Sequence, residues 1–74
     1  MARILVAEDD RNALNGLIEI LHQEGYDAVG ADSGPKALKL LEREKFDILL
    51  TDLRMPEMDG MQLYEHSQTI APYM

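Results

Sequence analysis

The sequence lacks cysteine and tryptophan, and its 74 residues contain no long apolar run. Without cysteine the chain forms no disulfide, no cysteine-ligated zinc site and no thiol nucleophile. Because no run approaches the ~20 apolar residues of a membrane-spanning helix, we expect no membrane segment. The apolar N-terminal stretch reaches an acid at Glu8, too soon for the core of a signal peptide, so we expect a cytoplasmic location.

Basic residues are scarce as well. Seven Lys and Arg stand against 14 Asp and Glu, which gives a net charge of −7. Because phosphate backbones bind clustered Lys and Arg, this balance speaks against nucleic acid as a direct partner. A glycine-rich phosphate-binding loop is also missing. The length allows one small domain, which buries only about 60% of its unfolded surface and is therefore marginally stable without help.

Short apolar runs alternate with helical patterns along the whole chain. We expect strands at 4–7, 26–31 and 46–51, and helices with apolar stripes over 14–21, 35–45 and 61–68. Apolar runs of this length without alternation are typical of strands buried on both faces. Asp9 or Asp10 is expected to cap the first helix, and Gly25 to end it. Strands that alternate with helices predict right-handed crossovers and a parallel α/β sheet.

Acidic residues follow two of the predicted strands. Glu8, Asp9 and Asp10 come after the first strand, and Asp52 comes after the third. In open α/β sheets the ligand site lies at the carboxyl ends of the strands, so neighbouring strands would gather all four carboxylates at one edge. Such a cluster recruits a cation, and hard oxygen ligands suit Mg²⁺. A carboxylate beside the metal can also act as a nucleophile and form an acyl phosphate.

Purely structural interpretations of the same residues stay open. Asp9 and Asp10 can be helix caps and nothing more, and Asp52 can simply end its strand. The predicted helix at 35–45 carries several of the basic residues, and the nearby acids Glu42 and Glu44 favour a solvated face there.

Two segments carry a family resemblance. Ile-Leu-Val-Ala-Glu-Asp-Asp at 4–10 and Asp-Leu-Arg-Met-Pro-Glu-Met-Asp-Gly at 52–60 resemble the receiver domain of bacterial two-component response regulators. Pro56 and Gly60 match the residues that shape the loop after the third strand. The resemblance implies a flavodoxin-like (CheY-like) parallel sheet with strand order 2-1-3-4-5. The flanking sequence is also similar to receivers attached to transcription activators of the nitrogen-regulation type.

The resemblance assigns a role to each acid. Asp52 matches the phosphoacceptor, which takes a phosphoryl group from a sensor histidine kinase. Asp9 matches the direct carboxylate ligand of Mg²⁺, and Glu8 matches the acidic position that often reaches the metal through water. Arg54 matches the residue whose main-chain carbonyl completes the metal shell. Asp10 is interpreted as a helix cap and not as a ligand.

The chain also departs from the family pattern. Receivers have five βα units and this chain shows three, so residues 1–74 correspond to the N-terminal part of the domain, truncated after the third unit. The fourth strand of a receiver ends in Ser or Thr and the fifth in Lys, and neither has a counterpart here. Lys45 lies before the third strand, at the opposite end of the sheet. We expect Mg²⁺ binding to survive and phosphotransfer and output to be impaired. The chain is then no enzyme, and at most catalyses its own phosphorylation and dephosphorylation.

A rival function follows from the same truncation. With the implied order, the third strand becomes an apolar edge, which invites pairing with another chain. Its apolar residues are Phe46, Ile48, Leu49 and Leu50. The chain is then expected to form a homo-oligomer or a swapped dimer, or to belong to a longer protein. The alternative function is a non-signalling assembly module that keeps the fold.

Overall fold

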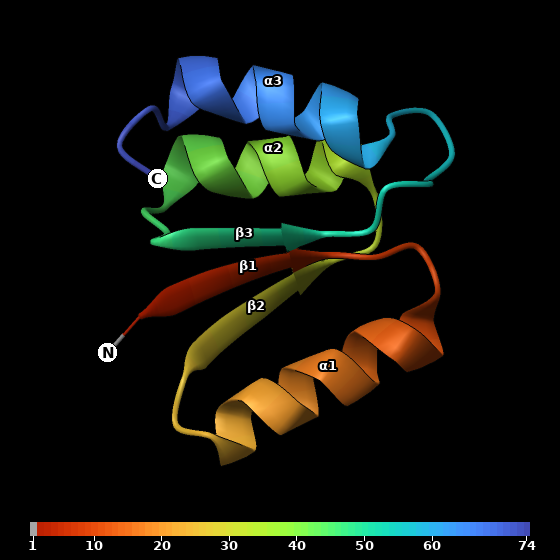
Figure 1. The fold of residues 1–74 in the computed structure, drawn as a ribbon, viewed down its shortest axis with the longest axis vertical. Coiled ribbons are helices and arrows are strands. Elements are labelled where there is room, and N and C mark those ends of the chain that lie inside the picture. Colours follow the sequence, from red (N-terminus) through yellow and green to blue (C-terminus); the bar gives the residue numbers. More distant parts are fainter. Residues whose placement is uncertain (1) are drawn as a thin grey trace.

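A computed structural model describes residues 2–74 and contains the predicted elements in the predicted order. They are β1 (Arg3–Ala7), α1 (Arg11–Gln23), β2 (Asp27–Ala31), α2 (Gly34–Arg43), β3 (Ile48–Thr51) and α3 (Gly60–Ile70). None of these helices has both the length and the apolar character that a membrane crossing requires. The alternation of strand and helix gives every strand a parallel neighbour, as Figure 1 shows.

The sheet has the order β2-β1-β3, and both pairings are parallel. The first strand of the chain is therefore the central one, as the flavodoxin-like order implies. At its carboxyl end, Ala7 lies opposite Ala31 of β2 and opposite Thr51 of β3. The segments that follow β1 and β3 thus leave the sheet side by side.

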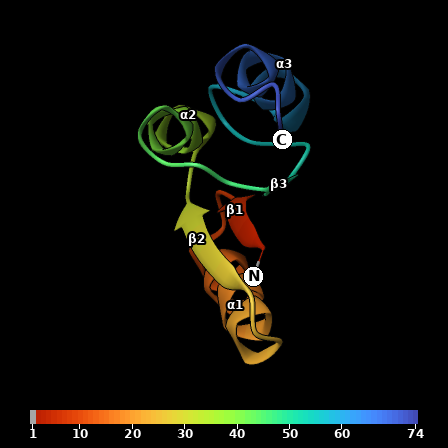
Figure 2. The ribbon, with the colours of Figure 1, turned by 90° about the vertical axis from the view of Figure 1, so that its left-hand side faces the viewer.

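The helices form a layer on each side of the sheet. Helix α1 covers one face, and α2 and α3 lie together on the other (Figures 1 and 2). The side chains of β1 alternate between these layers, as a strand requires. Ile4 and Val6 pack with Leu14 of α1, while Leu5 and Ala7 belong to the larger cluster under α2 and α3. The other buried members of that cluster are Ala31, Ala37, Leu41, Phe46, Met55, Leu63 and Ala71.

Helix α1 begins and ends as the sequence predicts. The Asp10 carboxylate accepts hydrogen bonds from the backbone N–H groups of Asn12 (2.9 Å) and Ala13 (3.3 Å), which have no partner inside the helix. Gly25 follows the helix with φ of 91°, the left-handed conformation in which glycine is favoured. Of the two candidate caps, Asp10 is the one used.

Strand β3 is shorter than predicted. It begins at Ile48 and not at Phe46. The Asp47 N–H still donates to the Arg3 carbonyl (2.8 Å), whereas the Arg3 N–H donates to the Asp47 carboxylate (2.7 Å), so regular main-chain pairing starts only at Ile48. Phe46 is 1% exposed and packs in the core under α2 and α3, so its predicted place on an exposed edge is wrong. Ile48 and Leu50 are exposed, as predicted.

Arg3 of β1 links β2 and the end of α2 at the amino end of the sheet. Its guanidinium donates to Asp27 of β2 (2.9 Å) and to Glu44 just after α2, and it lies 4.7 Å from the centre of the Phe46 ring. Glu44 has turned into extended backbone, so α2 ends earlier than predicted. Helix α3 instead continues beyond its predicted end, to Ile70.

Gly60 starts α3 directly against the backbone that leaves β3. Its N–H donates to the carbonyl oxygen of Leu53 (3.0 Å). A Cβ at this position would overlap the Asp52 carbonyl oxygen and lie 3.0 Å from the Leu53 Cα. Since both neighbours are main-chain atoms, neither can rotate away as a flexible side chain would.

Gly60→Ala should therefore lower the free energy of unfolding by about 1–3 kcal/mol, the usual cost of overpacking. Urea unfolding followed by circular dichroism measures the change. Gly16→Ala is the matched control, because a Cβ at Gly16 in α1 meets nothing within 4 Å. That substitution should raise stability by about 0.5–1 kcal/mol, the helix preference for Ala over Gly. A stabilising effect at Gly60 would contradict the close approach.

Candidate functional site

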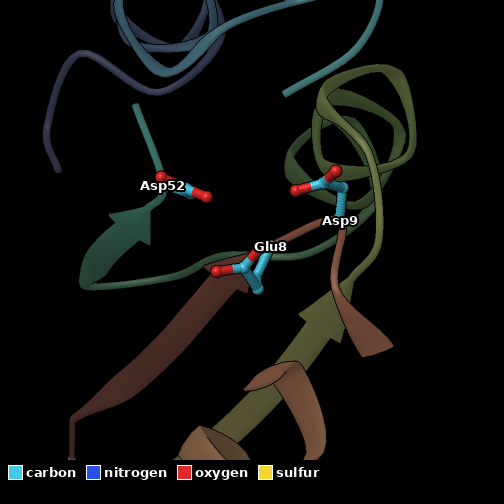
Figure 3. A group of neighbouring side chains, drawn as sticks. All are labelled: Glu8, Asp9 and Asp52. Carbon is cyan, nitrogen blue, oxygen red and sulfur yellow. The ribbon is translucent and has the colours of Figure 1, made fainter. Parts of the chain in front are cut away.

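Three carboxylates meet at the carboxyl edge of the sheet. Glu8, Asp9 and Asp52 each offer an oxygen, and these oxygens lie within 4.8 Å of one another (Figure 3). Glu8 and Asp9 follow β1, and Asp52 follows β3. The Asp52 N–H still donates to the Ala7 carbonyl (3.0 Å), which continues the pairing of the two strands by one residue. Parallel pairing is thus what brings residues so far apart in the chain together.

Asp10 does not join this cluster, although it was expected to reach the same edge. Its side chain is turned to the first turn of α1, where it caps the helix. Its backbone N–H donates to the Glu8 carboxylate (3.0 Å). Three of the four predicted acids therefore gather, and the fourth supports one of them through the main chain.

The cluster carries uncompensated negative charge. Within residues 2–74, none of the ion pairs includes Glu8, Asp9 or Asp52. The hydrogen bond from the Asp10 N–H lowers the pKa of Glu8, but desolvation, a hydrogen bond with Asp9 and the charge of Asp52 outweigh it. The net result is a Glu8 pKa above its usual value. Holding these groups ionised together costs free energy, which a cation would offset.

The donor set fits Mg²⁺. Carboxylate oxygens are the ligands this ion prefers, and none of the three residues is buried, so the ion can retain waters. Two oxygens that bind the same Mg²⁺ directly lie at most about 4.2 Å apart. A separation of up to 4.8 Å suits a set in which one carboxylate acts through water, or in which a small rotation closes the shell.

The loop after β3 holds Asp52 from its own backbone. The Arg54 N–H donates to the Asp52 carboxylate (3.3 Å), so the main chain of Arg54 lies beside the site, while a ligand role for its carbonyl stays a prediction. Asp59 and Gln62 form a capping box that fixes the start of α3. Between Arg54 and Asp59, Glu57 adopts φ of 69°, a conformation that favours glycine or asparagine. The loop therefore has a defined shape at both ends.

Thr51 adds a contact that sequence reasoning missed. Thr51 directly precedes Asp52 in the chain, and its hydroxyl donates to the main-chain carbonyl of Asp52 (2.9 Å). The only sequence signal is a hydroxyl residue next to a strand-ending Asp. A hollow of about 190 Å³ opens beside these residues, on the α1 side of β3. It is lined by Val6, Ala7, Glu8, Leu17, Leu50, Thr51 and Asp52.

Lys45 lies far from the cluster, as predicted. Its carbonyl accepts a hydrogen bond from the Arg3 guanidinium (3.3 Å), which places it at the amino end of the sheet. Lys36 is paired with Asp32 (2.8 Å) and not with the acids of the cluster. Within residues 2–74, the site therefore has its acidic components and no paired cationic side chain.

Known proteins share this sequence and fold. The family model of the response regulator receiver domain matches residues 4–73. The chain is 47% identical over 73 residues to the transcriptional regulatory protein GlrR of Escherichia coli K12, covering 99% of this chain and 16% of that protein. It is 43% identical over 72 residues to the receiver protein CpdR of Brucella abortus, covering 97% of this chain and 60% of CpdR.

A solved structure agrees with the sequence comparison. The response regulator TrrA of Thermotoga maritima, in complex with Mg²⁺ and BeF, superposes with a TM-score of 0.90 at 32% identity. The match covers 97% of this chain and 63% of that one. The chain thus spans less than two thirds of the length of these relatives. From its sequence, its fold and its acidic cluster, the chain belongs to the response regulator receiver domain family of two-component systems.

Proposed function

We propose that the chain accepts a phosphoryl group on Asp52 from the phosphohistidine of a sensor histidine kinase, with Mg²⁺ as cofactor. The observation that carries this proposal is the convergence of Glu8, Asp9 and Asp52 at the carboxyl edge of the sheet in a member of the receiver family. The domain would then act in signalling and not as an enzyme, and it would change no substrate other than its own Asp52. A cytoplasmic location is part of this proposal.

The chemistry assigns one task to each residue. A carboxylate oxygen of Asp52 attacks the phosphorus, the new P–O bond gives an acyl phosphate, and the P–N bond to the kinase imidazole breaks. The leaving imidazole nitrogen takes a proton from water. Asp9 would hold Mg²⁺ directly, Glu8 through water, and the Arg54 carbonyl would complete the shell. When bound, the ion supplies positive charge that neutralises the phosphoryl oxygens. The Mg²⁺ and BeF in TrrA support this assignment by analogy.

The proposed transfer is expected to be slow in this 74-residue chain. No cationic side chain of residues 2–74 is paired with Asp52, and electrostatic stabilisation of developing charge is often the largest catalytic contribution. We propose that residues 1–74 are the N-terminal part of a receiver domain, and that the family's Lys and Ser or Thr would complete the site. Output through the later helices would be impaired for the same reason.

A second candidate function rests on the free edge of β3. Within residues 2–74, β3 pairs with β1 alone. Two of its own apolar side chains are exposed, Ile48 (45%) and Leu50 (44%). A further hollow of about 270 Å³ lies between β3 and α3, next to Tyr64 and Met74. An uncovered apolar strand of this kind pairs readily with another chain. The alternative is therefore an assembly module that forms a homo-oligomer or swapped dimer.

Mg²⁺ should stabilise the folded chain. Because the folded-state pKa of Glu8 is raised, this group contributes most stability when protonated, and its contribution is lost as the pH rises through that pKa. Mg²⁺ should offset this loss at neutral pH, by about 1.4 kcal/mol when free Mg²⁺ is tenfold above its Kd. Thermal unfolding in Mg²⁺ and in EDTA, from pH 4 to pH 7, measures the difference.

Two substitutions test whether the response of Tm to Mg²⁺ comes from the carboxylate cluster. Asp52→Asn removes a ligand and a repelling charge, so it should raise Tm in EDTA and abolish most of the response to Mg²⁺. Asp10→Asn is the matched control, since Asn caps a helix as well as Asp does and Asp10 lies outside the cluster. If Asp10→Asn removed the response as completely as Asp52→Asn, the three-carboxylate site would be wrong.

Incubation with acetyl phosphate and Mg²⁺ tests the phosphoryl transfer. Intact mass spectrometry should show a gain of one phosphoryl group, lost in Asp52→Asn and in EDTA, and retained in Glu65→Gln on the exposed side of α3. Transfer from an autophosphorylated sensor histidine kinase is the second donor to try. No gain from either donor at any Mg²⁺ concentration would favour the assembly module.

Analytical ultracentrifugation tests the assembly module. The chain should sediment as a dimer or larger oligomer at low micromolar concentration, and Leu50→Lys should return it to monomer because a charge on the exposed apolar edge opposes pairing. Ile20→Lys is the matched control, since Ile20 is also an exposed apolar residue (57% exposed) but lies on α1. A stable folded monomer of the unaltered chain would overturn this candidate.

A further inference from the structure

A basic groove lies along the free edge of β2, at the opposite side of the sheet from β3. Its volume is about 460 Å³, and it runs between α1 and α2 with β2 at its base. Arg11 of α1 and three basic residues of α2 line it, namely Lys36, Lys39 and Arg43. These are four of the chain's seven Lys and Arg, gathered around one acid, Asp32, in a protein of net charge −7.

The basic residues of α2 form one row. Lys36, Lys39 and Arg43 are spaced i, i+3 and i+7, which puts them on the same face of a helix. The nearby acids that suggested a solvated face do not neutralise this row. Glu44 is bonded to Arg3 at the amino end of the sheet, and Glu42 is in none of the ion pairs of residues 2–74.

Only part of the groove's positive charge is paired. Asp32 contacts both Arg11 (3.0 Å) and Lys36 (2.8 Å). Within residues 2–74, no ion pair includes Lys39 or Arg43, and both side chains are exposed. Charges beyond about 8 Å are screened at physiological salt, so an incoming group meets the local positive charge of the groove and not the net charge of the chain.

The base of the groove offers backbone hydrogen bonds. Asp27 and Ala31 direct main-chain groups at β1, as their bonds to Ala2 and Glu8 show. In a strand these directions alternate, so Ala28 and Gly30 point outward from the sheet. His22 Nε2 contacts the outward carbonyl of Ala28 (3.0 Å). The outward N–H and C=O of Gly30 lie in the groove, where an added strand would pair.

We propose that this groove binds an extended acidic peptide segment of a partner protein, which adds to β2 as an edge strand. The main chain of the peptide would pair with Gly30, and its carboxylates would reach Lys39 and Arg43. The row from Lys36 to Arg43 spans about 10 Å of helix, which equals about three residues of extended chain. Acidic residues at alternate peptide positions would therefore face α2 together. Leu14 and Leu40 supply apolar contact between the charges.

Fluorescence anisotropy with a labelled hexapeptide of alternating Glu and Val tests the proposal on the intact chain. Lys39→Glu should weaken binding about threefold to tenfold, as expected for reversing an exposed charge pair. Lys45→Glu is the matched control, since Lys45 is also exposed but lies outside the groove, and it should leave Kd unchanged within twofold. Circular dichroism confirms that both variants are folded.

Two further measurements separate strand addition from general attraction of anions. Replacing the Val residues of the peptide by Pro removes backbone donors and should abolish binding. The Gly30 amide should show slowed hydrogen exchange when the Glu-Val peptide is bound. Equal binding of the Pro peptide, equal binding of a short DNA duplex, or equal weakening by Lys45→Glu would overturn the proposal. Because the groove and the carboxylate cluster are at different edges, Asp52→Asn should leave peptide binding intact.

Discussion

The position of β1 between its two parallel partners is the constraint on which the rest of the structure depends. β1 is paired with β2 over Arg3–Ala7 and with β3 over Ile4–Ala7, and Ile4 to Ala7 are buried, so its register fixes where β2 and β3 end. Glu8 and Asp9 directly follow β1, and Asp52 directly follows β3, so these ends place the three acids together. A shift of one residue in the pairing of β1 with β3 would reverse the faces of β3 and move Asp52 away from Glu8 and Asp9.

Charge is distributed unevenly along the strands. At the amino end, Arg3 is bonded to Asp27 and Glu44, and these bonds keep the pKa of its guanidinium above the usual value. At the carboxyl end, the acids of the cluster repel one another and have no paired cation within residues 2–74. The charges at the amino end of the sheet are therefore paired, whereas the unpaired carboxylates at the carboxyl end favour binding of a cation. The basic groove adds a third region, which lies along the free edge of β2.

The sequence predicted the contents of the sheet and most of the carboxylate cluster. Apolar runs and helical periodicity are local signals, and the rule that ligands lie at carboxyl ends then brings Asp52 to Glu8. Arg3 could not be predicted in the same way, because its partners lie 24, 41 and 44 residues away along the chain. Phe46 was misplaced for a related reason. An apolar residue before a strand looks like part of it in the sequence, and the hydrogen bond from the Arg3 N–H to the Asp47 carboxylate that marks the start of the ladder joins residues 44 apart.

The central place of β1 also has a consequence for the order of events in folding. β1 precedes both of its partners in the sequence, and its pairing is complete only once β3 is in place, since Ile4 pairs with Ile48. Closing that long loop costs entropy before any contact repays it, which slows folding. The carboxylates cannot meet until this step is complete. The carboxylate cluster therefore forms late in folding. A chain in which β3 has not yet paired with β1 contains Glu8, Asp9 and Asp52 but does not bring them together.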